Sequence, residues 1–275
     1  MIIGRLFCLT AHLPRTRRCS GAIWKTCVRR GWRSGEARQA AGTLRSFVEE
    51  AAMRVKGKKL FLRLAAAILV IAACGCGVVL SRYQHTSSRR PAGQYAGNIP
   101  QFHSSVDQDG DGLDDQADIL QGALDYVAAH PKYKSKYYST GYPNDRYGVC
   151  TDVVANAMKA AGYDLRELVD ADIRKHPENY QVDTPDKNID FRRVRNLLVY
   201  FQHNTVPLTT DLQDIKQWQG GDIVIFRNHI GIVSDRRNKN GVPYVIHHND
   251  PFQTAYEQDI LESRDDLVGH YRVSE

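Results

Sequence analysis

Cysteine is scarce in most of this 275-residue chain. Five of the six cysteines precede the end of an apolar run at Leu80: Cys8, Cys19, Cys27, Cys74 and Cys76. The 195 residues that follow (275 − 80) contain Cys150 alone. This part of the chain therefore has no internal disulfide, and its one thiol needs an explanation other than disulfide pairing within it.

Acidic residues are scarce at the other end. Residues 1–63 contain 15 Lys and Arg residues but only three acidic ones, whereas residues 64–275 contain 22 Lys and Arg residues against 28 acidic ones. The sequence pI of about 9.0 therefore comes from one basic flank. Because the rest of the chain is acidic, the basic pI does not indicate a nucleic-acid partner.

Long apolar runs are absent apart from one. Residues Leu64 to Leu80 form a stretch of 17 residues without a charge, at the short end of what spans a hydrocarbon core of roughly 30 Å. Lys56, Lys58, Lys59 and Arg63 precede it, and positive flanks stay cytoplasmic. The sequence thus predicts a single-pass signal anchor over 64–80 with an extracytoplasmic C-terminal domain; it does not indicate an oligomeric state.

Two alternatives to the anchor remain open. The motif "IAAC" at Ile71–Cys74 has the small residues that precede a lipid-modified cysteine, although the apolar run continues past Cys74. A buried soluble helix is the other. Upstream, residues 1–63 are interpreted as a basic cytoplasmic tail; a start at Met53 would give a conventional short basic region, so translation of residues 1–52 is also open.

Beyond the anchor, residues 81–105 are polar, with Ser, Gly and Pro, and predict a linker. Apolar periodicity then predicts helices over 119–129, 150–161, 165–176 and 191–203, followed by short β-rich runs over 221–226, 229–235, 243–248 and 269–273. Helices first and strands later predict an α+β fold with a helix packed on an antiparallel sheet.

The segment 106–130 begins with an acidic loop, "DQDGDGLDDQAD". Its spacing matches a single EF-hand-like calcium loop, with Gly112 at the sharp turn. The predicted ligands are Asp107, Asp109, Asp111, the carbonyl of Leu113, Asp115 and Asp118. The last position is Asp instead of the usual Glu, and a solvated acidic linker is the competing interpretation. We expect a structural Ca²⁺ that fastens this segment to the domain, and no cofactor for catalysis.

Cys150 opens the predicted helix 150–161. A free cysteine is most often a small buried hydrophobe, but a helix N-terminus favours a thiolate and can receive an oxyanion. A nucleophile there needs a histidine base. His229 starts a predicted strand after a two-residue turn and is expected to point to the sheet face that a helix covers. His247 and His248 alternate on another strand, so His247, His248 or Asn249 could orient the base.

Four motifs in one order carry a resemblance: "YGVCTDVV", "PDKNIDFRRVRNL", "GDIVIF…HIGIVSD" and "GHYRV". From about Tyr133 to Val273 the chain resembles a bacterial exported family, the domain-of-unknown-function family numbered twelve eighty-seven. That family looks related to the NlpC-type and CHAP cell-wall cysteine peptidases of the papain-like clan. The resemblance implies Cys150 as nucleophile, His229 as general base and His247 as third member. The chain departs from the family's usual "IHN" at His248.

Two other groups near these motifs are expected to be structural. Asp190 with Arg192 and Arg193 predicts capping and internal ion pairs in preference to substrate binding. Tyr138, Tyr142 and Tyr147 precede the nucleophile and are interpreted as packing residues.

The sequence therefore predicts a papain-like (NlpC-type) domain over 131–275. Its predicted function is that of an extracytoplasmic cysteine amidase or peptidase, a hydrolase acting on amide bonds in peptidoglycan peptides of the cell wall or in another amide substrate. Two alternatives stand beside it: a non-catalytic, calcium-stabilised cell-wall binding module, and a thiol acyltransferase of the same fold.

Overall fold

The computed structural model describes residues 34–275. Residues 1–33, the first part of the predicted basic tail, lie outside the described residues.

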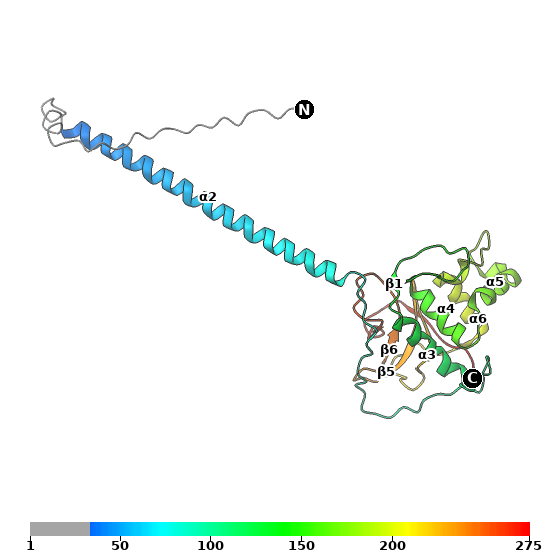
Figure 1. The fold of residues 1–275 in the computed structure, drawn as a ribbon. Helices are drawn as coiled ribbons and strands as arrows, with labels where there is room; N and C mark the ends of the chain where they lie inside the picture. The colour runs from blue at the N-terminus through cyan, green and yellow to red at the C-terminus, as the bar shows by residue number, and fades with distance from the viewer. Residues whose placement is uncertain (1–33) are drawn as a thin grey trace. The chain divides into compact units, whose positions relative to one another are not determined.

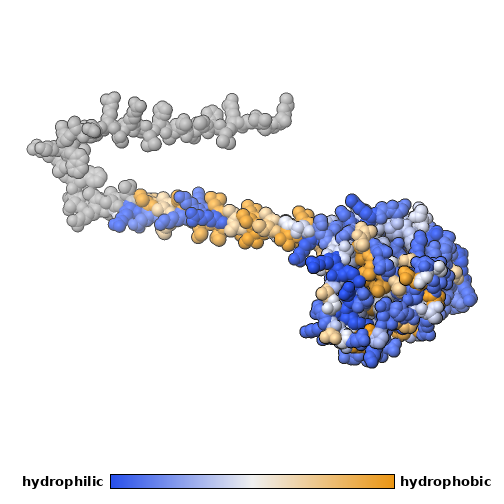
Figure 2. Space-filling model, turned by 60° about the horizontal axis from the view of Figure 1, so that its bottom comes forward, coloured by the Kyte–Doolittle hydropathy of each residue, from blue (hydrophilic) through white to orange (hydrophobic). Residues whose placement is uncertain are grey.

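A single long helix precedes the globular part. Helix α2 (Ser34–Arg82) contains the whole apolar run and is long and apolar enough to cross a membrane. Its apolar side chains are exposed, and Figure 2 shows hydrophobic surface gathered on its C-terminal part. The helix begins well upstream of Leu64, because Ala, Arg, Lys and Leu in the basic stretch are good helix formers.

The centre of the globular part is a six-stranded antiparallel sheet, with strand order β3-β8-β4-β5-β6-β7. The strands are β3 (Val206–Pro207), β4 (Ile223–Phe226), β5 (His229–Arg237), β6 (Pro243–Ile246), β7 (Glu257–Gln258) and β8 (Leu267–Arg272). The predicted turn is confirmed, because Phe226 pairs with His229 across the two residues between β4 and β5. All four predicted strands are present, so the α+β prediction is confirmed at this level.

Four helices follow the predicted periodicity: α3 (Asp115–Ala128), α4 (Cys150–Ala160), α5 (Leu165–Lys175) and α6 (Val194–Asn204). Short 3-10 turns occupy Pro177–Asn179 and Asp190–Arg192. Alternation along β4 divides the core in two, since Ile223 and Ile225 pack with the helices whereas Val224 and Phe226 pack on the other face. The helices therefore cover one face of the sheet.

Helices α3 and α4 lie against each other (Figure 1). Their contact is close at Gly122, where an added Cβ would lie 2.4 Å from the Cβ of Ala160. Glycine at this position lets the backbone of α3 approach the helix that begins at Cys150. A short parallel pair, β1 (Lys132–Tyr133) and β2 (Tyr147–Gly148), joins the two helices.

The segment predicted as a linker differs from that expectation. Ser87 forms a parallel bridge with Ala255 beside β7, and Arg90 binds Glu257 through two hydrogen bonds of 2.9 and 3.0 Å. Gln94 donates its backbone N–H to the carbonyl of Arg237. Polar residues in this segment thus have partners on the domain. Composition alone does not distinguish a solvated linker from a strap of this kind.

Candidate active site and acidic loop

Cys150 is the first residue of α4, as predicted. Asp152, three residues beyond the cap residue Val149, accepts the backbone N–H of Val149 at 2.8 Å and so fixes the start of the helix. Backbone N–H groups of Ile230 and Thr151 point to the thiol. Burial nevertheless raises the pKa of the Cys150 thiol to about 11. The expected thiolate is therefore not the resting form, because loss of hydration outweighs the N–H groups and the helix dipole.

His229 and His247 are brought together as predicted. Nε2 of His229 lies 2.9 Å from Nδ1 of His247, and both side chains are buried. Burial lowers the pKa of His229 to about 4 and places that of His247 well below its ordinary value. Both rings are therefore neutral at pH 7. Since Nε2 of His229 is occupied, Nδ1 is the nitrogen left to exchange a proton.

The ring of His229 does not point as expected. Its neighbours Ile230 and Ile232 fill the core under the helices, so alternation assigns His229 to the opposite row, where it stacks on Phe226 at 6.0 Å between ring centroids. Cys150 meets this strand at the backbone of Ile230, directly after His229. Within residues 34–275 no hydrogen bond joins the thiol to the His229 ring.

The three candidates for the third position separate clearly. His247 is the one that contacts His229. His248 lies on the other face, edge-on to Tyr133 and Tyr256 with ring centroids 5.3 and 5.2 Å away. It is 1% exposed, and among the described residues neither of its ring nitrogens has a hydrogen-bond partner. Asn249 turns to the loop and donates to Asp250.

Tyr133 is a neighbour of the thiol that the sequence analysis did not consider. Strand pairing sets it opposite Gly148, two residues before Cys150. After burial, the charge of Cys150 is the next largest cause that raises the pKa of Tyr133. The side chain of Gln84 donates to the Tyr133 carbonyl at 2.8 Å and accepts its N–H at 2.7 Å. No motif signals this residue, because its closeness to Cys150 depends on a two-residue strand.

The arginines and tyrosines expected to be structural form ion pairs and hydrogen bonds within the domain. Arg192 holds Asp152 with two hydrogen bonds of 2.7 and 2.8 Å, both side chains being almost fully buried. Arg193 pairs with Asp190 at 3.1 Å. The hydroxyl of Tyr138 donates to Asp145, and that of Tyr142 to Asp164.

A further buried polar cluster surrounds Asp222 on β4's N-terminal side. Arg272 donates to both carboxylate oxygens, at 2.8 and 3.0 Å, and Gln116 of α3 adds a bond of 2.9 Å. His270 lies 3.0 Å from the same carboxylate and stacks on Trp218 at 3.8 Å. Because these groups satisfy one another, the cluster joins α3 to the sheet and is structural.

The acidic loop folds as a turn with its carboxylates inward. Asp107 accepts backbone N–H groups from Gly110 and Gly112 at 2.8 and 3.0 Å. Both glycines have positive φ, 76° and 100°, a conformation that glycine adopts at little cost. Oxygens of Asp107, Asp109 and Asp111 lie within 4.8 Å of one another.

The other two predicted carboxylates lie in the first turn of α3. Asp115 is fully buried, accepting the N–H of Gln108 at 2.9 Å and the Tyr163 hydroxyl at 2.5 Å. Asp118 is 6% exposed, and one of its oxygens has no partner among the described residues. Burial and the neighbouring carboxylates raise the pKa of Asp118 to about 6. The charges of the four other carboxylates thus act on Asp118, but the oxygens grouped within 4.8 Å are those of Asp107, Asp109 and Asp111. Leu113 belongs to the same turn.

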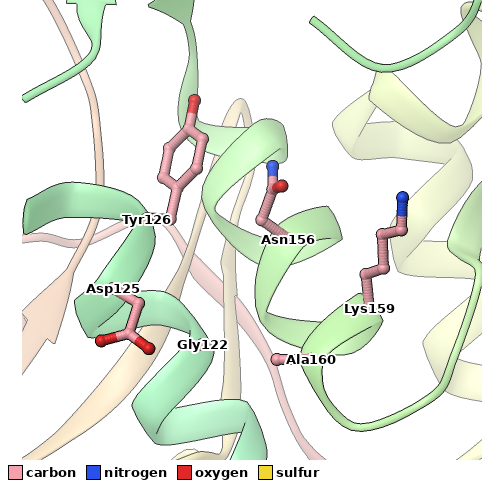
Figure 3. A pocket seen from close by; sticks show the side chains of 6 residues that line it. All are labelled: Gly122, Asp125, Tyr126, Asn156, Lys159 and Ala160. Carbon is pink, nitrogen blue, oxygen red and sulfur yellow. The ribbon is translucent and has the colours of Figure 1, made fainter. Parts of the chain in front are cut away.

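A surface hollow lies between α3 and α4 (Figure 3). Gly122, Asp125 and Tyr126 line it from α3, and Asn156, Lys159 and Ala160 from α4. It contains none of the predicted site residues. Figure 3 shows the Tyr126 hydroxyl pointing away from Asp125. A Cβ added at Gly148 would lie only 2.0 Å from that hydroxyl. Steric exclusion of any larger side chain therefore explains the glycine in "YGVC".

Comparison with known proteins gives a family without a known role. Residues 120–273 match the family described as "Domain of unknown function (DUF1287)". The chain is also 36% identical over 169 residues to "Uncharacterized protein YijF" of Escherichia coli strain K12, an alignment that covers 56% of this chain and 80% of that protein. No solved structure matches the chain.

Proposed function

The chain belongs to the DUF1287 family, and from the geometry around Cys150 we propose that it is an extracytoplasmic cysteine amidase or peptidase. One observation carries the proposal. The lone thiol of the domain, at the start of α4, meets the strand that begins with His229, whose ring is hydrogen-bonded to His247. A nucleophile, a base and an orienting group are the minimum set for acyl transfer through a thioester.

The finer fold proposed is papain-like, of the NlpC type. Three features support it. Cys150 is the first residue of a helix packed on an antiparallel sheet, and His229 is the first residue of β5. His247, the third member of the set, directly follows the neighbouring strand β6. These occur in the order implied by the resemblance to cell-wall peptidases.

The neutral resting groups determine the proposed proton path. If Nε2 of His229 donates to Nδ1 of His247, Nδ1 of His229 is bare. For the proposed step the ring has to turn from Phe226 towards Cys150, and Nδ1 then takes the thiol proton as sulfur bonds to the amide carbon. The imidazolium then returns this proton to the departing nitrogen as the C–N bond breaks. Water, deprotonated by His229, attacks the thioester and releases the acid and the thiol.

Peptidoglycan peptides are the proposed substrate. The apolar part of α2 would cross the membrane with its basic flank in the cytoplasm, and the domain would then lie on the side where cell-wall amides are found.

We further propose that the acidic loop binds a structural Ca²⁺. Five carboxylates at loop positions 1, 3, 5, 9 and 12 supply the hard oxygen ligands that calcium prefers. The partly unpartnered Asp118 supports this, because a buried carboxylate repelled by four others is stabilised by a cation. The residues in the EF-hand-like positions are Asp107, Asp109, Asp111, Leu113, Asp115 and Asp118. Calcium would take no part in the chemistry.

One observation favours a second candidate. The high pKa of the Cys150 thiol is also what an inert buried cysteine would show. A calcium-stabilised module that binds cell wall without cleaving it is therefore the competing function.

The test incubates the purified full-length chain, in detergent with calcium, with peptidoglycan and analyses the soluble fragments by mass spectrometry. We expect new amine termini from the wild type and none from Cys150→Ala, while His248→Leu, altered outside the proposed set, still releases them. Identical fragments from wild type and Cys150→Ala would refute the hydrolase. Retention of the protein on peptidoglycan without cleavage would support the binding module.

A further inference from the structure

The first feature is the junction between α2 and the domain. The apolar run closes at Leu80 and the helix at Arg82, and the Tyr83 N–H still bonds the carbonyl of Val79 at 3.1 Å. Three residues of helix rise about 4.5 Å. Since the headgroup layer on each side of a bilayer is roughly 5–8 Å thick, Tyr83 lies at headgroup depth when the apolar run spans the membrane.

The second feature is an exposed aromatic pair at this junction. The rings of Tyr83 and Phe252 are 5.5 Å apart between centroids and meet at 63°. Tyr83 is 49% and Phe252 48% exposed. Among the described residues they are the one aromatic pair in which both rings are exposed. Tyr is enriched at the membrane interface, where an amphipathic ring sits at the depth of the headgroups.

Hydrogen bonds order the backbone next to each ring of the pair. Asp250 accepts the Phe252 N–H at 2.7 Å and so shapes the turn that presents the ring. Gln84 donates its N–H to the carbonyl of Pro251 at 2.6 Å, in a positive-φ conformation (61°) that is unusual for this residue type. The turn with Phe252 is therefore held two residues from the end of the helix.

We propose that Tyr83 and Phe252 form a docking surface for the lipid bilayer that α2 crosses, with both rings in the headgroup layer. The occupant is lipid and not a protein, because the pair continues directly from the apolar helix. Arg82, directly before Tyr83, and Arg89 are both exposed, and their positive charge suits anionic headgroups.

This docking has a consequence for the candidate site that rests on the proposed function. The same Gln84 clamps both backbone groups of Tyr133, the neighbour of Cys150. Docking thus holds the Cys150 region beside the membrane surface, so the substrate class is amides presented at that surface, such as those of a lipid-linked precursor.

The test uses the full-length chain in vesicles of phosphatidylcholine and phosphatidylglycerol. Phe252→Trp and, separately, Tyr83→Trp introduce a fluorophore, and the spectrum of the parent chain is subtracted. Lipids brominated near the glycerol should quench the added fluorescence in both variants. Val268→Trp is the matched control: Val268 is 43% exposed, and its strand β8 is separated from β7 by β4, β5 and β6.

Quenching at position 252 no greater than at 268 would overturn the docking. A blue-shifted but unquenched emission at 252 would also overturn it, since a second copy of the chain would then cover the ring. The measurement needs no catalysis. Cys150→Ala added to Phe252→Trp should leave the quenching unchanged, so the docking and the hydrolase proposal can fail separately.

Discussion

At the scale of single residues, two effects of opposite sign act on the Cys150 thiol. The N–H groups of Ile230 and Thr151 favour the thiolate, and burial disfavours it. Burial prevails, as it does for buried groups in general, because desolvation shifts pKa values by several units while a helix terminus contributes about 1 kcal/mol. In the proposed mechanism the thiol proton therefore has to be removed before attack, because the resting group is the thiol and not a preformed thiolate.

This balance predicts how the thiol reacts. Alkylation of Cys150 by iodoacetamide in the full-length chain should be slower at pH 7 than that of a free cysteine and should rise towards the pKa of about 11. Mass spectrometry of the peptide containing Cys150 follows the rate, with N-acetylcysteine in the same solution as the reference for a free cysteine. A rate profile with a midpoint below 8 would show a preformed thiolate.

A second residue-scale prediction concerns Gly148. Gly148→Ala should destabilise the domain by roughly 1–3 kcal/mol, the usual cost of overpacking, because its Cβ would meet the Tyr126 hydroxyl at 2.0 Å. Tyr126→Phe removes that hydroxyl, which has no partner among the described residues. Urea unfolding of the four members of this double-mutant cycle checks the coupling. Additive effects would mean that the clash is not the cause.

At the scale of elements, the longer strands and helices could be predicted because each has a clear apolar period. Cys150, His229 and His247 could be placed for the same reason, since helix and strand starts follow turn signals. The pair β1 and β2 could not, because two-residue strands carry no period. Tyr133 was missed with them. The predicted orientation of His229 was wrong. Ile230 and Ile232 pack under the helices, so the residues that alternate with them, including His229, face the other side of the sheet.

The acidic loop and the first turn of α3 form one unit, and the raised pKa of Asp118 predicts how its stability depends on pH and calcium. A carboxyl whose folded pKa is raised from 3.8 to about 6 makes the metal-free protein lose stability as pH rises through this range. Calcium should therefore raise the melting temperature more at pH 7 than at pH 5. At 100 times the dissociation constant the gain is about 2.7 kcal/mol.

Asp118→Asn is the matched variant for this effect. It should melt higher than wild type without calcium at pH 7 and lose most of the response to calcium, as measured by thermal scans with calcium or chelator. Equal calcium responses in the two proteins would exclude Asp118 as a ligand.

For the whole molecule, the buried histidines contribute to the loss of stability in acid. His229 and His248 have folded pKa values lowered from 6.5 to about 4. Between these values the unfolded chain binds more protons, so stability is present above pH 6.5 and falls as pH drops towards 4. For His248 alone the lowered pKa corresponds to about 3 kcal/mol.

His248→Leu should accordingly reduce the loss of stability between pH 6.5 and 4, since it removes a buried ring whose nitrogens have no hydrogen-bond partner among the described residues. Urea unfolding at several pH values, with calcium present to hold Asp118 ionised, measures the slope. An unchanged slope would show that His248 is hydrated in the folded protein.

The segment around Ser87, which precedes the acidic loop, also covers the chain next to the edge strand β7. β7 is only two residues long, and the bridge from Ser87 to Ala255 covers the chain beside it. An uncovered edge strand is a template for pairing with another chain. By laying its own incoming segment there, the protein protects this edge against intermolecular strand addition. Cleavage between α2 and Ser87 would therefore leave the protection in place, whereas loss of Ser87 itself would expose the edge to aggregation.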